Sequence, residues 1–71
     1  MLTKSNFEKG DLVKVKMQDH DYFDKIGKVE VVLRNRVAAD AVLVNMRDGF
    51  HDWFAGFEEN LEKIENFPEK S

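Results

Sequence analysis

Few side chains in the sequence could carry out covalent chemistry. Cysteine is absent, and apart from Tyr22 the hydroxyl side chains are Thr3, Ser5 and Ser71, which stand near the two ends of the chain. A catalytic nucleophile must be held within hydrogen-bond reach of its base, and chain ends are commonly the least ordered segments of a domain. The glycine-rich motifs that cradle nucleotide phosphates are also missing from the sequence. We therefore predict that the protein is not an enzyme and has no catalytic residues.

Two short segments with histidine and aspartate could supply metal ligands. Asp19-His20-Asp21 and His51-Asp52 offer nitrogen and oxygen donors. Zinc requires three or four ligands in a tetrahedral arrangement, and consecutive loop residues point in divergent directions, so at most one or two of the first three could converge. We expect solvated side chains here, and we predict neither a metal site nor a cofactor.

Aromatic residues give the strongest indication of a binding function. Trp53 and Phe54 are neighbours on a predicted strand and face opposite sides, so only one of them can easily fill a narrow interior. Trp53 then either packs beneath the long loop that holds Tyr22 and Phe23 or is exposed with them as an aromatic ledge. Tryptophan and tyrosine are favoured interface anchors because they bury a large area at low entropic cost. The predicted partner-binding residues are Tyr22, Phe23, Trp53, Arg34 and Arg36.

Charge is divided unevenly along the chain. Residues 1–36 hold eight basic and six acidic side chains, whereas residues 37–71 hold three basic and eight acidic ones, and the net charge is −3. A protein that binds nucleic acid through phosphates needs a basic face. The residues that could form one are Lys14, Lys16, Lys28, Arg34 and Arg36. Lysines on strands are more typical of a solvated outer face, so RNA binding is the alternative hypothesis.

The apolar pattern predicts a small all-β domain. Apolar and polar residues alternate with the period of two that a half-buried strand requires. Asp48-Gly49 is a strong hairpin signal because this pair tolerates positive φ. We expect strands at Leu12–Met17, Lys28–Arg34, Ala41–Met46 and Phe50–Phe57, with long connections over Gln18–Lys25 and Arg34–Asp40.

One face of these strands should form the core. The predicted buried residues are Val13, Val15, Val29, Val42, Val44 and Leu61. In the second strand, the run Val31-Val32-Leu33 suggests a bend that buries residues of both faces, so that Val31 or Val32, together with Leu33, joins the core. A domain of this size hides only about 60% of the surface of its unfolded chain, and its stability should be marginal.

The segment after Phe57 has two possible structures. The spacing of Phe57, Leu61, Ile64 and Phe67 is helical and indicates a helix over Glu58–Asn66. Alternatively, a short helical turn at Glu58–Asn60 drops Leu61 into the core and is followed by a strand over Glu62–Glu65. We favour the turn and strand, because four strands of a curled sheet leave an open edge that a fifth strand covers with few residues.

With the strands in this order, the chain resembles the SH3-like small barrels. The matching segments are Phe7–Val15, Lys25–Val32 and Glu59–Ile64. The first two also resemble the KOW motif of ribosomal and transcription-elongation proteins, in which Gly27 would take the bend position and Val29 and Val32 the core positions. The arrangement is similar, too, to the small SH3-like accessory subunits of photosynthetic electron transfer, which dock on other proteins and carry no cofactor. The resemblance implies a five-stranded barrel over residues 7–66, with a flexible N-terminus over residues 1–6 and a flexible tail over residues 67–71.

These observations predict a non-catalytic protein-docking module or small accessory subunit. The partner protein is expected to bind the long first loop and the fourth strand, and a KOW-like RNA- or ribosome-associated module is the alternative. The longest apolar run is Ala41–Val44, so we predict no membrane insertion and a cytoplasmic location. We also expect a monomer when the protein is isolated.

Overall fold

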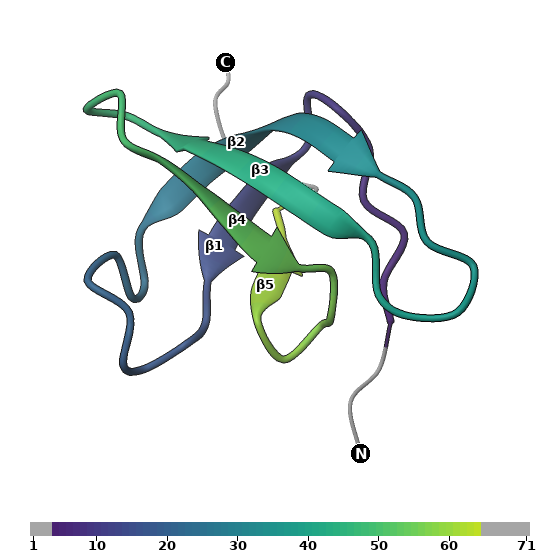
Figure 1. The fold of residues 1–71 in the computed structure, drawn as a ribbon. Coiled ribbons are helices and arrows are strands. Elements are labelled where there is room, and N and C mark those ends of the chain that lie inside the picture. The colour runs from purple at the N-terminus through teal and green to yellow at the C-terminus, as the bar shows by residue number, and fades with distance from the viewer. Residues whose placement is uncertain (1–3, 65–71) are drawn as a thin grey trace.

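A computed structural model of the chain describes residues 4–64; residues 1–3 and 65–71 lie outside the described part. Five antiparallel strands form one sheet in the order β4-β3-β2-β1-β5 (Figure 1). The strands are β1 (Leu12–Val15), β2 (Ile26–Leu33), β3 (Ala41–Met46), β4 (His51–Ala55) and β5 (Leu61–Lys63). No helix occurs among residues 4–64, which confirms the all-β prediction. Nothing in this range therefore has the form of a long apolar helix that could cross a membrane.

The sheet is curled but open. β4 and β5 are its two edges, and no pairing joins them in the described part of the chain. In Figure 1, β1 and β5 lie behind β3 and β4, which places the two halves of the sheet around a common interior. The finer prediction of a closed barrel is therefore not confirmed by the pairing.

The segment after Phe57 forms a turn and a strand. The backbone N–H groups of Asn60 and Leu61 both donate to the Phe57 carbonyl, at 3.0 and 3.1 Å, and β5 then pairs with β1. The predicted short helical turn is wrong: residues 58–60 form a hydrogen-bonded turn without a helix. The alternative of a helix is also wrong for residues 58–64, because pairing with β1 satisfies the backbone groups of β5 and buries Leu61. The rest of that predicted helix, and Glu65 of the predicted strand, lie outside the described residues.

Six residues predicted to be buried lie in the core, and one, Leu33, does not. Its buried apolar residues are Phe7, Val13, Val15, Val29, Val42, Val44, Met46, Phe54 and Leu61. Leu33, predicted to join them, is 55% exposed. The reason is a β-bulge between Val29 and Val31, which turns Val32 toward the core and leaves Val31 and Leu33 on the other face.

Side chains of β3 pack against the backbone of β2 at Gly27, which pairs with Met46. A Cβ added at Gly27 would lie 2.6 Å from Val44 Cγ1 and 2.7 Å from Met46 Sδ. Only glycine fits without displacing these core side chains. Glycine at this position therefore lets the core pack closely against the beginning of β2.

Two connections hold the ends of the sheet. The β3–β4 hairpin turns over three residues, with Gly49 at φ 92° and the Met46 N–H bonded to the Phe50 carbonyl at 2.7 Å. This confirms the predicted hairpin at Asp48-Gly49. In the connection between β2 and β3, the Asp40 carboxylate accepts from the Asn35 N–H and from the Arg34 guanidinium. These donors hold the pKa of Asp40 below its usual range.

The start of the described chain is paired with the segment that follows β4. Lys4 forms a bridge with Phe57, and the Ser5 N–H donates to the Gly56 carbonyl at 3.0 Å. Residues 4–6 of the predicted flexible N-terminus are thus hydrogen-bonded or bridged to other segments. Residues 1–3 and the predicted tail at 67–71 lie outside the described residues.

The two faces of the sheet should differ in their tolerance of the same substitution. Leu61→Ala removes a buried side chain and should lower the free energy of unfolding by about 2–4 kcal/mol. Leu33→Ala makes the matched change on the exposed face and should alter the free energy of unfolding by about 0.5 kcal/mol or less. Urea denaturation of both variants measures the difference, and equal losses would contradict the assignment of faces.

Candidate docking surface

The face of the sheet opposite the core carries apolar side chains. Val42, Val44 and Phe54 point into the core, so the residues that alternate with them point outward. Val31 pairs with Leu43, and Leu43 pairs with Trp53, which forms one row across β2, β3 and β4. Leu33 lies one step along β2 in the adjacent row, beside Ala41 and Ala55. We call Val31, Leu33, Leu43 and Trp53 the outer strip.

Much of the outer strip is exposed to solvent. The exposed fraction is 48% for Trp53 and 39% for Val31, and Leu43 is half-buried between its neighbours. Single exposed apolar residues are ordinary, but neighbouring ones on paired strands form a patch of the kind that marks an interaction site. The outer strip is therefore the candidate docking surface.

Trp53 does not pack beneath the long loop. The loop meets the inner face instead: the rings of His20 and Phe54 lie 5.0 Å apart, and Tyr22 packs against the core. Trp53 was expected either beneath the long loop or on an exposed ledge, and the structure excludes the position beneath the loop. It also separates Trp53 from Tyr22, because the two side chains lie on opposite faces of the sheet.

Tyr22 is an anchor of the loop. Its ring stacks on Phe50 with centroids 4.7 Å apart, and its hydroxyl donates to Asp48 Oδ2 at 2.6 Å. This hydrogen bond raises the pKa of Tyr22 and, with the Phe50 N–H that also donates to Asp48, lowers the pKa of Asp48. The neutral tyrosine and the ionised aspartate are therefore the favoured pair in the folded protein.

His20 fastens the same loop to β4. Its Nδ1 accepts from the Tyr22 N–H at 3.0 Å, so the ring proton is assigned to Nε2, which donates to Asp52 Oδ2 at 2.8 Å. His20 of the loop and Asp52 of the strand, both considered above as possible metal ligands, thus form a hydrogen bond with each other. Among residues 4–64, no group of three or more histidine, cysteine or acidic side chains is arranged to hold a metal ion.

The other predicted site residues are dispersed. Phe23 is exposed on the long loop, and Arg36 is exposed in the connection between β2 and β3. Arg34 is held by ion pairs of 3.0 Å to both Glu8 and Asp40 and by a hydrogen bond to Asn6. The predicted surface therefore does not form one cluster, although Trp53 remains a central residue of the candidate surface.

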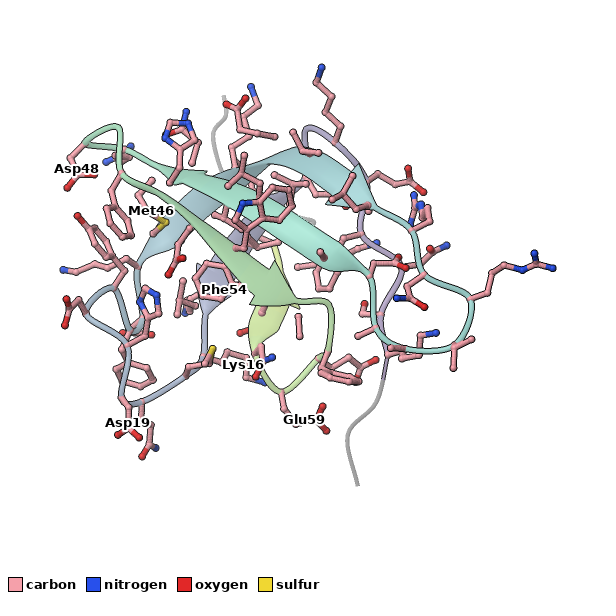
Figure 2. All side chains as sticks on the ribbon, viewed as in Figure 1. Lys16, Asp19, Met46, Asp48, Phe54 and Glu59 are labelled. Atoms are coloured by element: carbon pink, nitrogen blue, oxygen red, sulfur yellow. The ribbon has the colours of Figure 1, made fainter. Side chains whose placement is uncertain are left out.

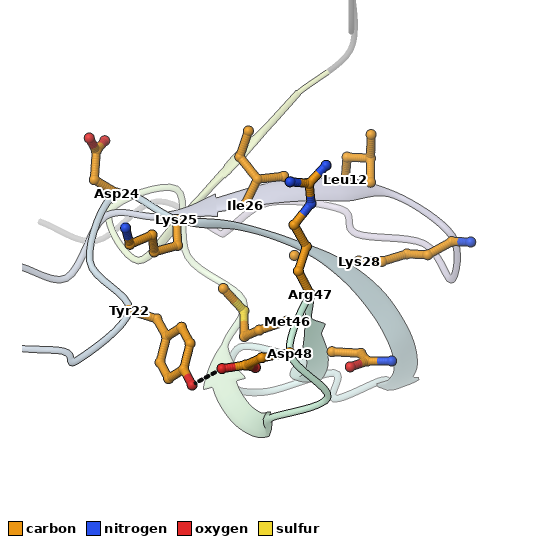
Figure 3. Close-up of a pocket in the computed structure, with 11 residues that line it drawn as sticks. Leu12, Tyr22, Asp24, Lys25, Ile26, Lys28, Met46, Arg47 and Asp48 are labelled. Carbon is orange, nitrogen blue, oxygen red and sulfur yellow. Dashed lines mark hydrogen bonds between the residues drawn. The ribbon is translucent and has the colours of Figure 1, made fainter.

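An open groove of about 900 Å³ is lined by residues of β1, β2, the end of β3 and the segments next to them (Figure 3). It runs past the beginning of β2 and the β3–β4 hairpin, whose Asp48 marks the turn in Figure 2. Its cationic lining residues are Lys25, Lys28 and Arg47, for which the described residues supply no ion pair. Lys28 also pairs with Asn45 in the row next to Val31 and Leu43, so the groove and the strip meet there.

Sequence reasoning missed most of the outer strip. Leu43 alternates with the correctly predicted core residues Val42 and Val44, and this alternation was the available signal that it faces outward. Leu33 and Val31 gave no such signal, because their faces are set by the bulge. The groove joins segments that are distant in sequence, so no local motif indicates it.

Comparison of the chain with protein-family models, with curated proteins and with solved structures gives no match.

The hydrogen bond between Tyr22 and Asp48 should make stability depend on pH. The raised pKa of Tyr22 implies a contribution that is present below the usual tyrosine pKa of about 10 and is lost as pH rises through the folded value. The lowered pKa of Asp48 implies a contribution that is present above the usual aspartate pKa of about 4 and is lost as pH falls through the folded value. Tyr22→Phe keeps the stacked ring, removes the contribution of Tyr22, and leaves Asp48 only the part that backbone N–H groups such as that of Phe50 supply.

Urea denaturation of wild type and Tyr22→Phe across the pH range tests this pairing. The variant should be less stable than wild type near neutral pH, and the difference should narrow at strongly acidic and strongly alkaline pH. A difference that stays constant with pH would show that the hydroxyl does not bond the ionised carboxylate.

Proposed function

We propose that the protein is a non-catalytic docking module that binds a partner protein through the outer strip, with Trp53 at the centre of the contact. The observation that carries this proposal is the row Val31–Leu43–Trp53, in which an exposed indole lies beside aliphatic neighbours on three paired strands. A large aromatic residue surrounded by aliphatic ones is the usual composition of an interface centre.

The rigidity of this surface favours binding. Leu43 and Trp53 belong to strands that are paired along their length, and β3 is paired on both sides. Little backbone entropy is then lost when a partner docks, so more of the apolar contact energy appears as affinity. The long loop is also anchored, through Tyr22 and His20, but its exposed Phe23 has no comparable apolar neighbours on paired strands.

The edge of β4 is less suited to a partner than its outer face. The Trp53 N–H donates to Asp52 Oδ1 at 2.9 Å, and the Ala55 carbonyl accepts from Asn60 Nδ2 and from the Phe57 N–H. A partner strand added at this edge would need such backbone groups to be free. Recognition by side chains on the sheet face is therefore the more favourable mode.

We further propose that the sheet belongs to the SH3-like small barrels. The five short antiparallel strands, the close packing at Gly27 and the bulge before Val31 support this assignment. A docking role without catalysis or a cofactor, a cytoplasmic location and a monomeric free protein remain parts of the proposal.

RNA binding is the second candidate function. It is favoured by Lys25, Lys28 and Arg47, cations without an ion pair in the described structure, and by the exposed Trp53 on the same sheet. Single-stranded RNA requires a basic track with stackable rings, whereas the neighbours of Trp53 in the outer strip are aliphatic and the net charge is −3. Protein docking therefore explains more of the surface.

The proposed function predicts opposite responses from two exposed aromatic residues. Trp53→Ala should weaken binding of the partner captured from an extract of the source organism by about 2 kcal/mol or more, which is roughly thirtyfold in affinity. Phe23→Ala is the matched control on the loop and should change it little. Calorimetric titration of the purified partner gives the affinities, and circular dichroism checks that both variants are folded.

The same capture separates the two candidate functions. Nuclease treatment of the extract should leave the partner bound, because the contact is between proteins. Loss of the partner on nuclease treatment would favour RNA. Loss of binding with Phe23→Ala but not with Trp53→Ala would place the site on the loop and contradict the proposal.

A further inference from the structure

We infer that the docking partner presents an acidic segment with apolar residues, whose carboxylates lie in the groove while its apolar side chains cover the outer strip. This inference rests on the proposed function and adds the chemistry of the partner. It is carried by the charge of the groove and by the continuity of the groove with the strip.

The groove contains cationic groups that are not neutralised. Lys25, Lys28 and Arg47 line it, and residues 4–64 provide none of them with an ion pair. The same lining holds two carboxylates: Asp48, which accepts hydrogen bonds from the neutral Tyr22 hydroxyl and the Phe50 N–H, and Asp24, which lies 3.7 Å from Lys14. Three cations against two carboxylates leave the lining with a formal charge of +1, which favours an anionic ligand.

The groove and the outer strip form one continuous surface. Lys28 and Asn45 are cross-strand partners that line the groove, and Val31 and Leu43 form the next outward-facing row along the same strands. Successive outward residues on a strand are about 7 Å apart. A short peptide segment can therefore reach both, with acidic side chains on the cations and apolar side chains against Trp53 and Leu43.

The remaining charge of the molecule favours the same orientation. Acidic residues also lie on segments outside the groove lining, among them Asp19 on the long loop and Glu58 in the turn before β5. An acidic partner is repelled by these segments and attracted to the groove, which steers its approach. Glu30 is the carboxylate nearest to Lys28 along β2, and it accepts from Asn45 Nδ2 at 3.0 Å, which fixes its position and keeps its negative charge.

Two synthetic peptides provide the test. They share the same leucine and phenylalanine positions, and every other position is glutamate in one and lysine in the other. Each is titrated into the isotopically labelled full chain while its amide NMR signals are followed. The glutamate peptide should bind about tenfold more tightly than the lysine peptide and should shift the amides of Lys28, Arg47 and Trp53. Its binding should weaken as salt rises to about 0.5 M.

Charge reversal sharpens the test. Lys28→Glu should weaken binding of the glutamate peptide. Lys16→Glu makes the same charge change outside the groove lining and should have little effect on that binding. The double variant Lys28→Glu/Arg47→Glu should reverse the preference, so that the lysine peptide binds more tightly. Such a reversal also shows that the variant is folded and that the strip is intact.

The outcomes separate this inference from the proposed function. Equal binding of both peptides, abolished by Trp53→Ala, would overturn the acidic partner and leave docking on the strip in place. Binding of the glutamate peptide that is indifferent to Trp53→Ala would overturn the strip as docking site and, with it, the inferred partner. Binding of neither peptide, or tighter binding of a single-stranded oligouridine than of the glutamate peptide, would overturn the inference.

Discussion

A single curled sheet can bury one face against itself, and the other properties of this protein follow from that constraint. The inner face brings Val44, Phe54 and Leu61 into one apolar core, and their removal from water stabilises the fold. The outer face places Trp53 and Leu43 side by side on paired strands. Exposed apolar groups favour association over solubility, and for this reason we propose that a partner covers them.

The division of aromatic residues between the two faces connects the fold to the proposed site. Tyr22 stacks on Phe50 and bonds Asp48, and His20 bonds Asp52, so the long loop is fixed without any contribution from Trp53. The same bonds hold the ionised Asp48 carboxylate to the loop, and the cations of the neighbouring groove have no ion pair within residues 4–64. The loop contacts therefore leave both the tryptophan and these cations open to a partner.

The sequence pattern predicted correctly the residues whose face follows from the local pattern. It failed for residues whose position depends on how the strands pair. All six predicted core residues are buried: the period of two located Val42 and Val44 among others, and the predicted turn after Phe57 placed Leu61. It misplaced Leu33, because a bulge shifts the face of each later residue and becomes visible only when β2 is paired with β3. Tyr22 was expected at an exposed ledge, whereas its bond to Asp48 joins residues 26 positions apart. Trp53 was predicted as a site residue because its neighbour Phe54 was expected to fill the core. Its cross-strand neighbours could not be predicted, because they depend on the register of the strands.

Solvent access to Trp53 tests the central claim most directly. It is the only tryptophan of the chain, so the fluorescence of the unmodified protein reports on the outer strip alone. Quenching by acrylamide is measured for the free protein and again with the glutamate peptide, which contains no tryptophan. We predict efficient quenching in the free protein and protection with a blue shift of the emission when the peptide is bound. Protection of Trp53 already in the free protein, or quenching that the bound peptide leaves unchanged, would contradict the outer strip as the docking surface.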